Sequence, residues 1–461
     1  MPEVSPERTE LIYSVCRSGP GGQKRMGQID WRSKKSARVR RYQWVSLCLV
    51  MIVGTVFILD RSTLAIANHN VSHDLNLSPT QMGLLLSAFS WAYAFSQFPV
   101  GILLDRIGAR TVLAVGIFFW SVAQVSTGFI LSLRQFLFAR VLLGVGEAPI
   151  YPAGAKVVAD WFHKRERGGP TGIFLSSTTI GPVIAPPILT TLMLTLGWRD
   201  MFIAMGVFGA LLSIAWYAMA RNHKDVLFTK TESEYFEDKD GASEQKLNLA
   251  GVRGLLSQYT TWGIILGFVG IIYMIWLYLT WLPAYLESEF RVSIAQVGWI
   301  LSVPYIFGTL GNISSGYLAD SLLSRGMSTI NSRKYPICIG LLGASIFTIS
   351  TAYAPGPASA VISLCIVMFF LYLASAGAWA LVNIVTPRSK IATMGALQNF
   401  GGYFGGSFAP IITGFLLEHT HSFKSALMMS SVVAFAAAVL YLGLVRRPID
   451  DVVLRSTPNE F

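Results

Sequence analysis

The sequence predicts an all-α integral membrane protein with twelve transmembrane helices in two similar six-helix halves. Three observations lead to this prediction. Twelve apolar runs recur along the chain, and each is long enough to cross a bilayer as a helix. Lys and Arg gather in alternate loops between these runs. Short motifs of the first half return in the same order in the second half.

Composition supports the membrane class. Of the 461 residues, 53% are hydrophobic and only 13% are charged, whereas a soluble domain carries about 25% charged residues. The net charge of +11 lies largely in tails and loops, so it does not indicate a nucleic-acid partner. The cysteines have no metal-ligand spacing, so we expect no metal site, and we expect no cofactor. They are Cys16, Cys48, Cys338 and Cys365.

The chain begins with a polar, basic segment, residues 1–43. It has no apolar stretch followed by a small-residue cleavage site, so it does not read as a secretory signal. We expect this segment to be disordered. Its basic end should contact anionic lipid at the cytoplasmic surface. That end carries Lys34, Lys35, Arg38, Arg40 and Arg41.

Six apolar runs follow in residues 44–220, the first predicted half. They cover about 44–67, 81–104, 111–132, 134–156, 170–194 and 199–220. A polar linker, residues 221–258, separates this half from the second, residues 259–447. The runs of the second half cover about 260–286, 295–320, 335–354, 359–385, 391–417 and 423–445. Residues 448–461 form a predicted cytoplasmic tail.

Basic residues in the loops predict the orientation. One set of loops is basic, and the alternate set carries almost no Lys or Arg. The basic set contains Arg106, Arg110, Lys164, Arg165, Arg167, Arg325, Arg333, Lys334, Arg388, Lys390, Arg446 and Arg447. By the positive-inside rule, these loops, both termini and the linker face the cytoplasm. We therefore expect a monomeric, multi-pass protein of the inner membrane.

An internal repeat relates the two halves. GILLD at 101–105 resembles GYLAD at 316–320, and GPVIAP at 181–186 resembles GGSFAP at 405–410. The matching stretches lie about 215 to 225 residues apart, which is close to half of the chain. Duplication of a six-helix unit is typical of secondary transporters.

Two adjacent charges, Asp60 and Arg61, lie near the middle of the first apolar run. Each costs about 2.5–3.5 kcal/mol at the centre of a membrane helix. Such residues face the interior of a bundle or a wet cavity rather than lipid. We expect Arg61 to present a fixed positive charge at mid-membrane depth and Asp60 to neutralise it.

The fourth run carries a second charged pair, Arg140 and Glu147. They lie seven positions apart, which is about two helical turns, so they share a face of the helix. Two interpretations remain open. The pair is either a structural buried salt bridge, or Glu147 is a carboxyl group that carries a proton because burial favours its neutral form. In the second case Asp60 and Glu147 form a proton relay, with Arg61 and Arg140 as charge partners or an anion site.

The stretch 101–110, between the second and third runs, reads GILLDRIGAR. Its spaced positions are Gly101, Asp105, Arg106, Gly108 and Arg110. The glycines permit close helix packing and a tight turn, and the carboxylate can accept hydrogen bonds from a helix N-terminus. An ordinary basic loop would not need this spacing. The pattern resembles the signature loop of the major facilitator superfamily, which implies the fold of that family and a loop that latches the two halves together in the outward-open state.

Five further stretches resemble the anion:cation symporter branch of that superfamily, and the resemblance covers about 44–447. They are LDRSTLA at 59–65, SAFSWAY at 87–93, GEAP at 146–149, TWLP at 280–283 and QNFGG at 398–402. The branch includes bacterial transporters of hexonates, hexarates and hexuronates. The resemblance is greatest to bacterial carriers of sugar acids such as galactonate, galactarate, glucarate and gulonate.

The resemblance implies roles for individual residues. Asp60 and Glu147 match the proton-coupling acids of the branch, and Arg61 matches an Arg that pairs with charges near the site. Residues that match the substrate site are Tyr93, Trp379 and Asn399. The departures from the family pattern are Thr178 in place of Gln, Ala376 in place of Ser and Ile58 in place of Tyr. These departures leave the exact substrate open.

A sugar acid needs a cation for its carboxylate and hydrogen-bonding partners for its hydroxyl groups. Arg61 offers a planar fork of donors for the carboxylate. Candidates for the hydroxyl groups are Tyr93, Thr178, Trp379, Gln398 and Asn399. Helix packing is the alternative role for the aromatic residues. Asn399 lies in the glycine-rich stretch 395–406, where a buried amide needs a partner and small neighbours leave room for one.

We therefore expect a proton-coupled symporter that imports a sugar-acid anion such as galactonate, gulonate, glucarate, galactarate or a hexuronate. A carrier of another organic anion, such as a dicarboxylate or an aromatic acid, is the alternative within transporters. A non-transporting nutrient sensor is the alternative from another class, although the linker contains no recognisable signalling module. An enzyme is disfavoured because the sequence has no G-x-S-x-G, no His-rich metal constellation and no P-loop.

Overall fold

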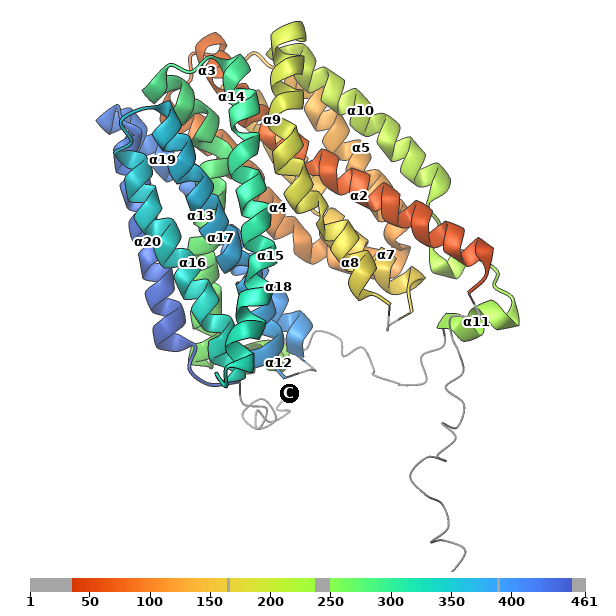
Figure 1. The fold of residues 1–461 in the computed structure, drawn as a ribbon. Helices are drawn as coiled ribbons and strands as arrows, with labels where there is room; N and C mark the ends of the chain where they lie inside the picture. Colours follow the sequence, from red (N-terminus) through yellow and green to blue (C-terminus); the bar gives the residue numbers. More distant parts are fainter. Residues whose placement is uncertain (1–34, 164–165, 237–248, 388–389, 450–461) are drawn as a thin grey trace, which may run out of the picture.

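The computed structural model describes residues 35–163, 166–236, 249–387 and 390–449, and the regular elements within these ranges are helices (Figure 1). The first half contains α2 (Ala37–Ile66), α3 (Asn68–Asp74), α4 (Pro79–Ile107), α5 (Ala109–Thr127), α6 (Leu133–Glu147), α7 (Ile150–Trp161), α8 (Gly168–Leu175), α9 (Ser177–Leu196) and α10 (Trp198–Met219). The linker contains η1 (His223–Asp225), α11 (Lys230–Phe236) and α12 (Leu249–Leu256). The second half contains α13 (Tyr259–Phe290), α14 (Ile294–Ile300), α15 (Ser302–Ser324), α16 (Thr329–Ala352), α17 (Pro357–Val385), α18 (Ile391–Gly406), α19 (Phe408–Thr420) and α20 (Phe423–Leu444).

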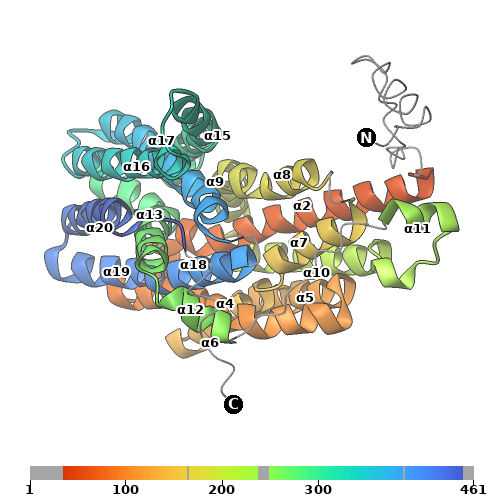
Figure 2. The same cartoon turned by 90° about the horizontal axis from the view of Figure 1, so that it is seen from below.

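In the described part of the chain, the helices make twelve passes between the two ends of the molecule, as the sequence predicts. Eleven stretches in the described part of the chain are long and apolar enough to cross a membrane, and α4, with 29 residues, makes the remaining pass. Four passes consist of two consecutive helices each: α6 with α7, α8 with α9, α14 with α15, and α18 with α19. Seen from below, α15, α16, α17 and α20 of the second half lie on the left of the picture, and α2, α5, α7, α8 and α10 of the first half extend to the right (Figure 2).

The first pass begins earlier than the apolar pattern suggests. Ser36 caps α2 by accepting a hydrogen bond from the backbone N–H of Val39 over 3.1 Å. The helix therefore starts at Ala37, and residues 37–43 are helical, although we expected disorder up to residue 43. A cap and polar contacts of this turn, such as Gln43 with Trp161, extend the helix beyond its apolar part. The predicted tail also includes residues 1–34, which lie outside the described residues.

The two ends of the molecule differ in how the halves meet. We call the end where α2 and α13 begin the basic end, because it carries the basic loops, and the opposite end the far end. Figure 1 shows the halves converging near α3, α14 and α9 at the far end and diverging towards α8, α11 and α12 at the basic end. Contacts between α4 and α19, and between α9 and α14, join the halves at the far end.

Hydrogen bonds fasten the far end. Glu418 on α19 accepts hydrogen bonds from the hydroxyl of Ser78, over 2.8 Å, and from the backbone N–H of Thr80, over 3.0 Å. Gly414, one turn before Glu418, lies so close to α4 that an added Cβ would overlap the carbonyl oxygen of Pro79. At the basic end, no hydrogen bond or ion pair joins the halves among the described residues. The halves are therefore joined at the far end, whereas their ribbons lie apart at the basic end (Figure 1).

Candidate substrate and proton site

The two adjacent charges of α2 point to different helices. Neighbouring residues of a helix are about 100° apart around its axis. Arg61 donates from Nε to Oε2 of Glu147 on α6 over 3.2 Å, and both side chains are buried. Asp60 is fully buried and accepts a hydrogen bond at Oδ1 from Gln124 on α5 over 2.9 Å. We had expected Asp60 to neutralise Arg61. It does not do so through direct contact, because Glu147 forms the ion pair with Arg61 instead.

Aromatic rings surround the guanidinium group of Arg61. Its Cζ lies 3.8, 4.8 and 4.6 Å from the ring centroids of Phe57, Phe89 and Tyr93. The ring of Trp276, on α13 of the second half, is 5.4 Å away. Cation–π attraction stabilises an arginine in such surroundings, and a desolvated contact contributes about 2 kcal/mol. We call Arg61, Glu147 and these four rings the arginine box, to which both halves contribute.

Several polar atoms in and near the arginine box have no hydrogen-bond partner among the described residues. They are Nη2 of Arg61, Oε1 of Glu147, Oδ2 of Asp60, the hydroxyl of Tyr93, and Nε and Nη2 of Arg140. More than nine in ten buried polar groups in proteins are hydrogen-bonded. A concentration of unsatisfied charged groups is costly to fold, so it indicates a site that binds polar ligands or protons.

Arg140 does not form the ion pair that its spacing from Glu147 suggested. It lies close enough to Asp60 and Glu147 to interact with both electrostatically. Among the described residues, however, the ion-pair partner of Glu147 is Arg61. The guanidinium carbon of Arg140 lies 5.7 Å from the ring centroid of Phe136, one turn earlier on α6. Arg140 is therefore a nearby positive charge whose remaining donors stay available.

The structure brings some predicted substrate residues to the arginine box and separates others from it. Tyr93 belongs to the box, and its ring centroid lies 5.4 Å from that of Tyr403 on α18. Asn399, one turn before Tyr403, donates from Nδ2 to Oε1 of Gln97 on α4 over 3.0 Å. These contacts place Tyr93 and Asn399 along one seam between the two halves.

The other three predicted substrate residues have different surroundings. Thr178 donates its hydroxyl to the carbonyl of Leu175 in its own turn. Trp379 is 44% exposed and packs edge-on against Phe268, with ring centroids 5.6 Å apart. Gln398 is fully buried, and neither of its amide atoms has a hydrogen-bond partner among the described residues. None of the contacts found for these three residues reaches the arginine box.

Sequence reasoning missed four residues of this region: Gln97, Gln124, Trp276 and Tyr403. Gln97 and Tyr403 each lie four residues after a predicted site residue, so helical spacing could have found them. Gln124 gives no comparable signal, because an uncharged polar residue inside a membrane helix has many roles. Trp276 comes from the other half, and only the packing of α2 against α13 reveals it.

The signature loop is bound by the start of the linker, which follows the first half. Gly108, with a positive φ of 93°, ends α4 and starts α5, a conformation that favours glycine. The side-chain Oδ1 of Asn222 accepts a hydrogen bond from the backbone N–H of Arg110 over 3.0 Å. Arg106 accepts one at its carbonyl from Lys224. Asp105 is exposed, and no hydrogen bond is found for its carboxylate in the described part of the chain, as expected where the halves are apart at this end.

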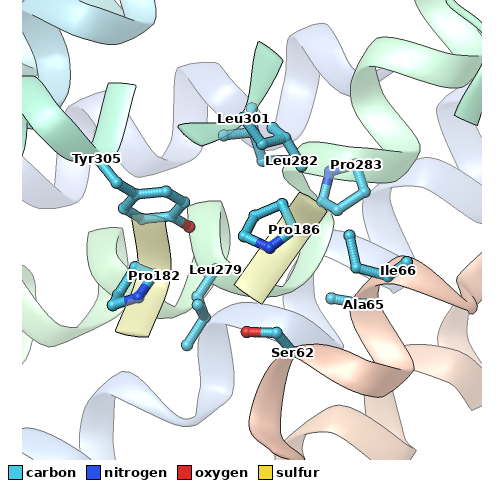
Figure 3. Close-up of a pocket in the computed structure, with 10 residues that line it drawn as sticks. All are labelled: Ser62, Ala65, Ile66, Pro182, Pro186, Leu279, Leu282, Pro283, Leu301 and Tyr305. Atoms are coloured by element: carbon cyan, nitrogen blue, oxygen red, sulfur yellow. The ribbon is translucent and has the colours of Figure 1, made fainter. Parts of the chain in front are cut away.

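A small apolar pocket lies between the halves on the far side of the arginine box. Its lining consists of Ser62, Ala65 and Ile66 of α2, Pro182 and Pro186 of α9, Leu279, Leu282 and Pro283 of α13, and Leu301 and Tyr305 (Figure 3). Its volume of about 10 Å³ leaves room for one water molecule at most. Figure 3 shows two hydroxyl groups among otherwise apolar side chains. The pocket is part of an apolar barrier at the far end rather than a site for a sugar acid.

Comparison with known proteins agrees with this architecture. The family model described as Major Facilitator Superfamily matches residues 50–410 and 288–458. The probable L-galactonate transporter of Escherichia coli (strain K12) is 40% identical over 92% of this chain and 93% of its own length. The probable galactarate/D-glucarate transporter GarP of the same strain is 33% identical, over 89% of this chain and 96% of its own length.

A solved structure supports the fold. A bacterial homologue of the human lysosomal transporter Spinster, in an inward-facing and unoccupied conformation, superposes with a TM-score of 0.76. The alignment covers 88% of this chain and 97% of that one, at 17% identity, so the likeness concerns the fold alone. With the family match over most of the chain, these findings lead to one conclusion. The chain belongs to the Major Facilitator Superfamily, and it is a membrane transporter rather than an enzyme.

Proposed function

We propose that this protein is a proton-coupled symporter that imports a sugar-acid anion across the inner membrane. The observation that carries the proposal is the arginine box. It holds one guanidinium group between a carboxylate of the first half and an aromatic ring of the second half. A transporter needs a site at which both halves contact the substrate, because rocking of the halves then exposes that site to each side in turn.

The pairing of Arg61 with Glu147 suggests how protons and substrate are coupled. A proton on Glu147 removes the negative charge that holds Arg61, so the guanidinium fork is free to bind a substrate carboxylate. Loss of that proton restores the ion pair and displaces the substrate. Asp60, bound to Gln124, is the second proton carrier. Protons moving down their gradient would thus favour inward transport.

The orientation follows from the distribution of charge. The basic end carries the Arg- and Lys-rich loops, so we assign it and both termini to the cytoplasm. On this assignment the end at which the halves lie apart faces the cytoplasm, and the ion pair of Arg61 with Glu147 corresponds to the state after release of proton and substrate. We assign one protomer as the functional unit, because the site is built from the two halves of one chain.

The proposed substrate class rests on chemistry and on similarity. Arg61 suits a carboxylate, and the polar side chains of the seam suit hydroxyl groups. Two relatives that match this chain over most of their length are named as transporters of L-galactonate and of galactarate or D-glucarate. We therefore propose galactonate and related hexonates as first candidates, with hexarates and hexuronates next. Another small organic anion remains the alternative.

Uptake into proteoliposomes tests the proposal. Purified protein is reconstituted, and labelled galactonate is supplied outside with an inward-directed proton gradient. The expected result is accumulation above the external concentration, which collapses when a protonophore is added. Accumulation of galactonate that does not depend on the proton gradient would exclude proton coupling. No uptake of any sugar acid, with uptake of a dicarboxylate or aromatic acid instead, would support the alternative substrate class.

A further inference from the structure

Two amide side chains from opposite halves meet along the seam between α4 and α18. Asn399 donates from Nδ2 to Oε1 of Gln97 over 3.0 Å. No other hydrogen bond found between the halves in the described residues lies as close to the basic end. The sequence pattern indicates a polar role for Asn399 but gives no such signal for Gln97.

The amide pair lies one helical turn from the arginine box, towards the basic end. Gln97 follows Tyr93 by four residues on α4, and Asn399 precedes Tyr403 by four residues on α18. The Tyr93–Tyr403 contact and the Gln97–Asn399 hydrogen bond therefore lie one helical turn apart between the same two helices. The Tyr93–Tyr403 contact borders Arg61, whose Cζ lies 4.6 Å from the centroid of the Tyr93 ring. The amide pair therefore comes next to the arginine box on the side of the basic end.

The amide pair keeps hydrogen-bonding capacity that suits hydroxyl groups. An amide side chain has one acceptor oxygen and two N–H donors. The bond between them uses the oxygen of Gln97 and one donor of Asn399. A carbonyl oxygen on Asn399 and an N–H on each residue remain. Both side chains are partly exposed, whereas Arg61 and Glu147 are buried.

The order of groups along the seam suits the two kinds of group in one sugar-acid molecule. A carboxylate bound at Arg61 leaves a chain of hydroxyl groups, each of which both donates and accepts. If that chain extends from Arg61 towards the basic end, the amide pair is the next pair of polar side chains after Tyr93 and Tyr403. An acid without hydroxyl groups would gain nothing from these donors and would leave them unpaired, which is costly.

We propose that Gln97 and Asn399 form an amide clamp that binds a hydroxyl group of the substrate, and that Gln97 thereby sets the preference for polyhydroxy acids. This inference rests on the proposed function. It assigns Gln97 as a specificity-determining residue and explains why its partner lies in the other half. A substrate held by the clamp contacts both halves at once, one turn from the residue that binds its carboxylate.

The test compares affinities for galactonate and for a set of monodeoxy galactonates, each lacking one hydroxyl group, by titration calorimetry of the whole purified protein. The variant is Gln97→Met, which keeps the length of the side chain and removes the amide. Gln97→Asn is the second variant, which keeps the amide but shortens its reach. The matched control is Gln135→Met, because Gln135 is exposed at the far end and its side chain accepts a hydrogen bond from the nearby backbone N–H of Leu131. Size-exclusion profiles check folding.

We expect Gln97→Met to weaken galactonate binding about three- to tenfold, the size of one hydrogen bond. For the one deoxy compound that lacks the clamped hydroxyl, the same variant should change affinity less than twofold. Gln135→Met should change neither. A variant that only shifts the equilibrium between conformations changes the affinities for all compounds by the same factor. An equal loss of affinity for every compound would therefore contradict the proposed clamp. If wild-type protein binds no sugar acid at all, the proposed function fails, and the clamp fails with it.

Discussion

At the scale of the residue, the site depends on which partner Arg61 has. Its guanidinium group binds Glu147 while four aromatic rings enclose it. Sequence alone identified Asp60, Arg61 and Glu147, because charges inside apolar runs cannot face lipid. It could not pair them, since adjacent residues leave a helix in different directions and the partner depends on how α2, α5 and α6 pack. The aromatic enclosure was likewise unpredictable, because most aromatic residues in such a chain only pack helices.

Replacement of Arg61 by lysine tests whether the planar fork binds the substrate carboxylate. Lysine keeps the charge but loses the paired donors. We expect Arg61→Lys to weaken galactonate binding by about 1.5–3 kcal/mol, the contribution of a charge-assisted hydrogen bond. Titration calorimetry measures the change. If the variant binds galactonate as tightly as the wild type does, the carboxylate is held elsewhere, and Arg140 becomes the next residue to test.

Replacement of Asp60 by asparagine tests the second proton carrier. The amide fits the space of the carboxyl group and can still bond Gln124, but it cannot titrate. We expect Asp60→Asn to abolish accumulation driven by a proton gradient while exchange of internal for external galactonate continues. Parallel accumulation and exchange assays give the answer. Wild-type accumulation by this variant would show that Asp60 has a structural role.

At the scale of the element, the sequence predicts the twelve passes well because an apolar run of about 20 residues has few other uses. The sequence pattern does not predict the ends and breaks of helices that polar contacts determine. The extension of α2 to Ala37 depends on a cap at Ser36 and on the packing of Gln43. The break between α6 and α7 occurs where Pro149 lacks a backbone N–H. Such local features shift the ends of helices without changing the hydrophobic pattern.

The linker helix α11 folds back on the first half at the basic end. Its Tyr235 accepts a hydrogen bond from Gln43 over 2.9 Å and donates to Glu166 over 2.7 Å. Glu232 accepts from the hydroxyl of Ser36 and from the backbone N–H of Thr229. The hydrogen bond from Ser36, followed by that from Thr229, lowers the pKa of Glu232 below its ordinary value.

This lowered pKa predicts how docking of α11 depends on pH. A group whose pKa is depressed in the folded state stabilises that state above its unfolded pKa, and the contribution disappears as pH falls through the lowered value. We expect amide hydrogen exchange in residues 229–236 to accelerate below the ordinary pKa range of Glu, after correction for intrinsic rates. Glu232→Gln should remove that dependence. An unchanged pH profile in the variant would show that Glu232 does not hold the helix.

At the scale of the whole molecule, the repeat and the alternation of basic loops predict two halves and one orientation. The sequence does not predict at which end the halves are joined, because a transporter of this kind has to adopt more than one arrangement of the same halves. The joining of the halves at the far end depends on contacts such as that between Gly414 and Pro79. Only the packed structure shows these contacts.

A larger side chain between α19 and α4 should prevent the close packing of these helices at the far end. We expect Gly414→Leu to push α19 away from α4, so that spin labels at Leu131 and Tyr353 move apart. These two residues are 77% and 62% exposed in far-end loops of opposite halves, and the labels require a background without native cysteines. Gly443→Leu is the matched control, because an added Cβ at Gly443 meets no atom within 4 Å. Equal label distances in both variants would contradict the importance of this contact.

The most direct test of the account measures proton movement with substrate. Galactonate is added to lightly buffered proteoliposomes without an imposed gradient, and external pH is recorded. For the wild type we predict alkalinisation of the medium as protons enter with the anion. For Glu147→Gln we predict no alkalinisation, although galactonate still exchanges across the membrane. Galactonate entry without proton movement in the wild type, or wild-type alkalinisation by Glu147→Gln, would contradict the coupling of Arg61 and Glu147 to transport.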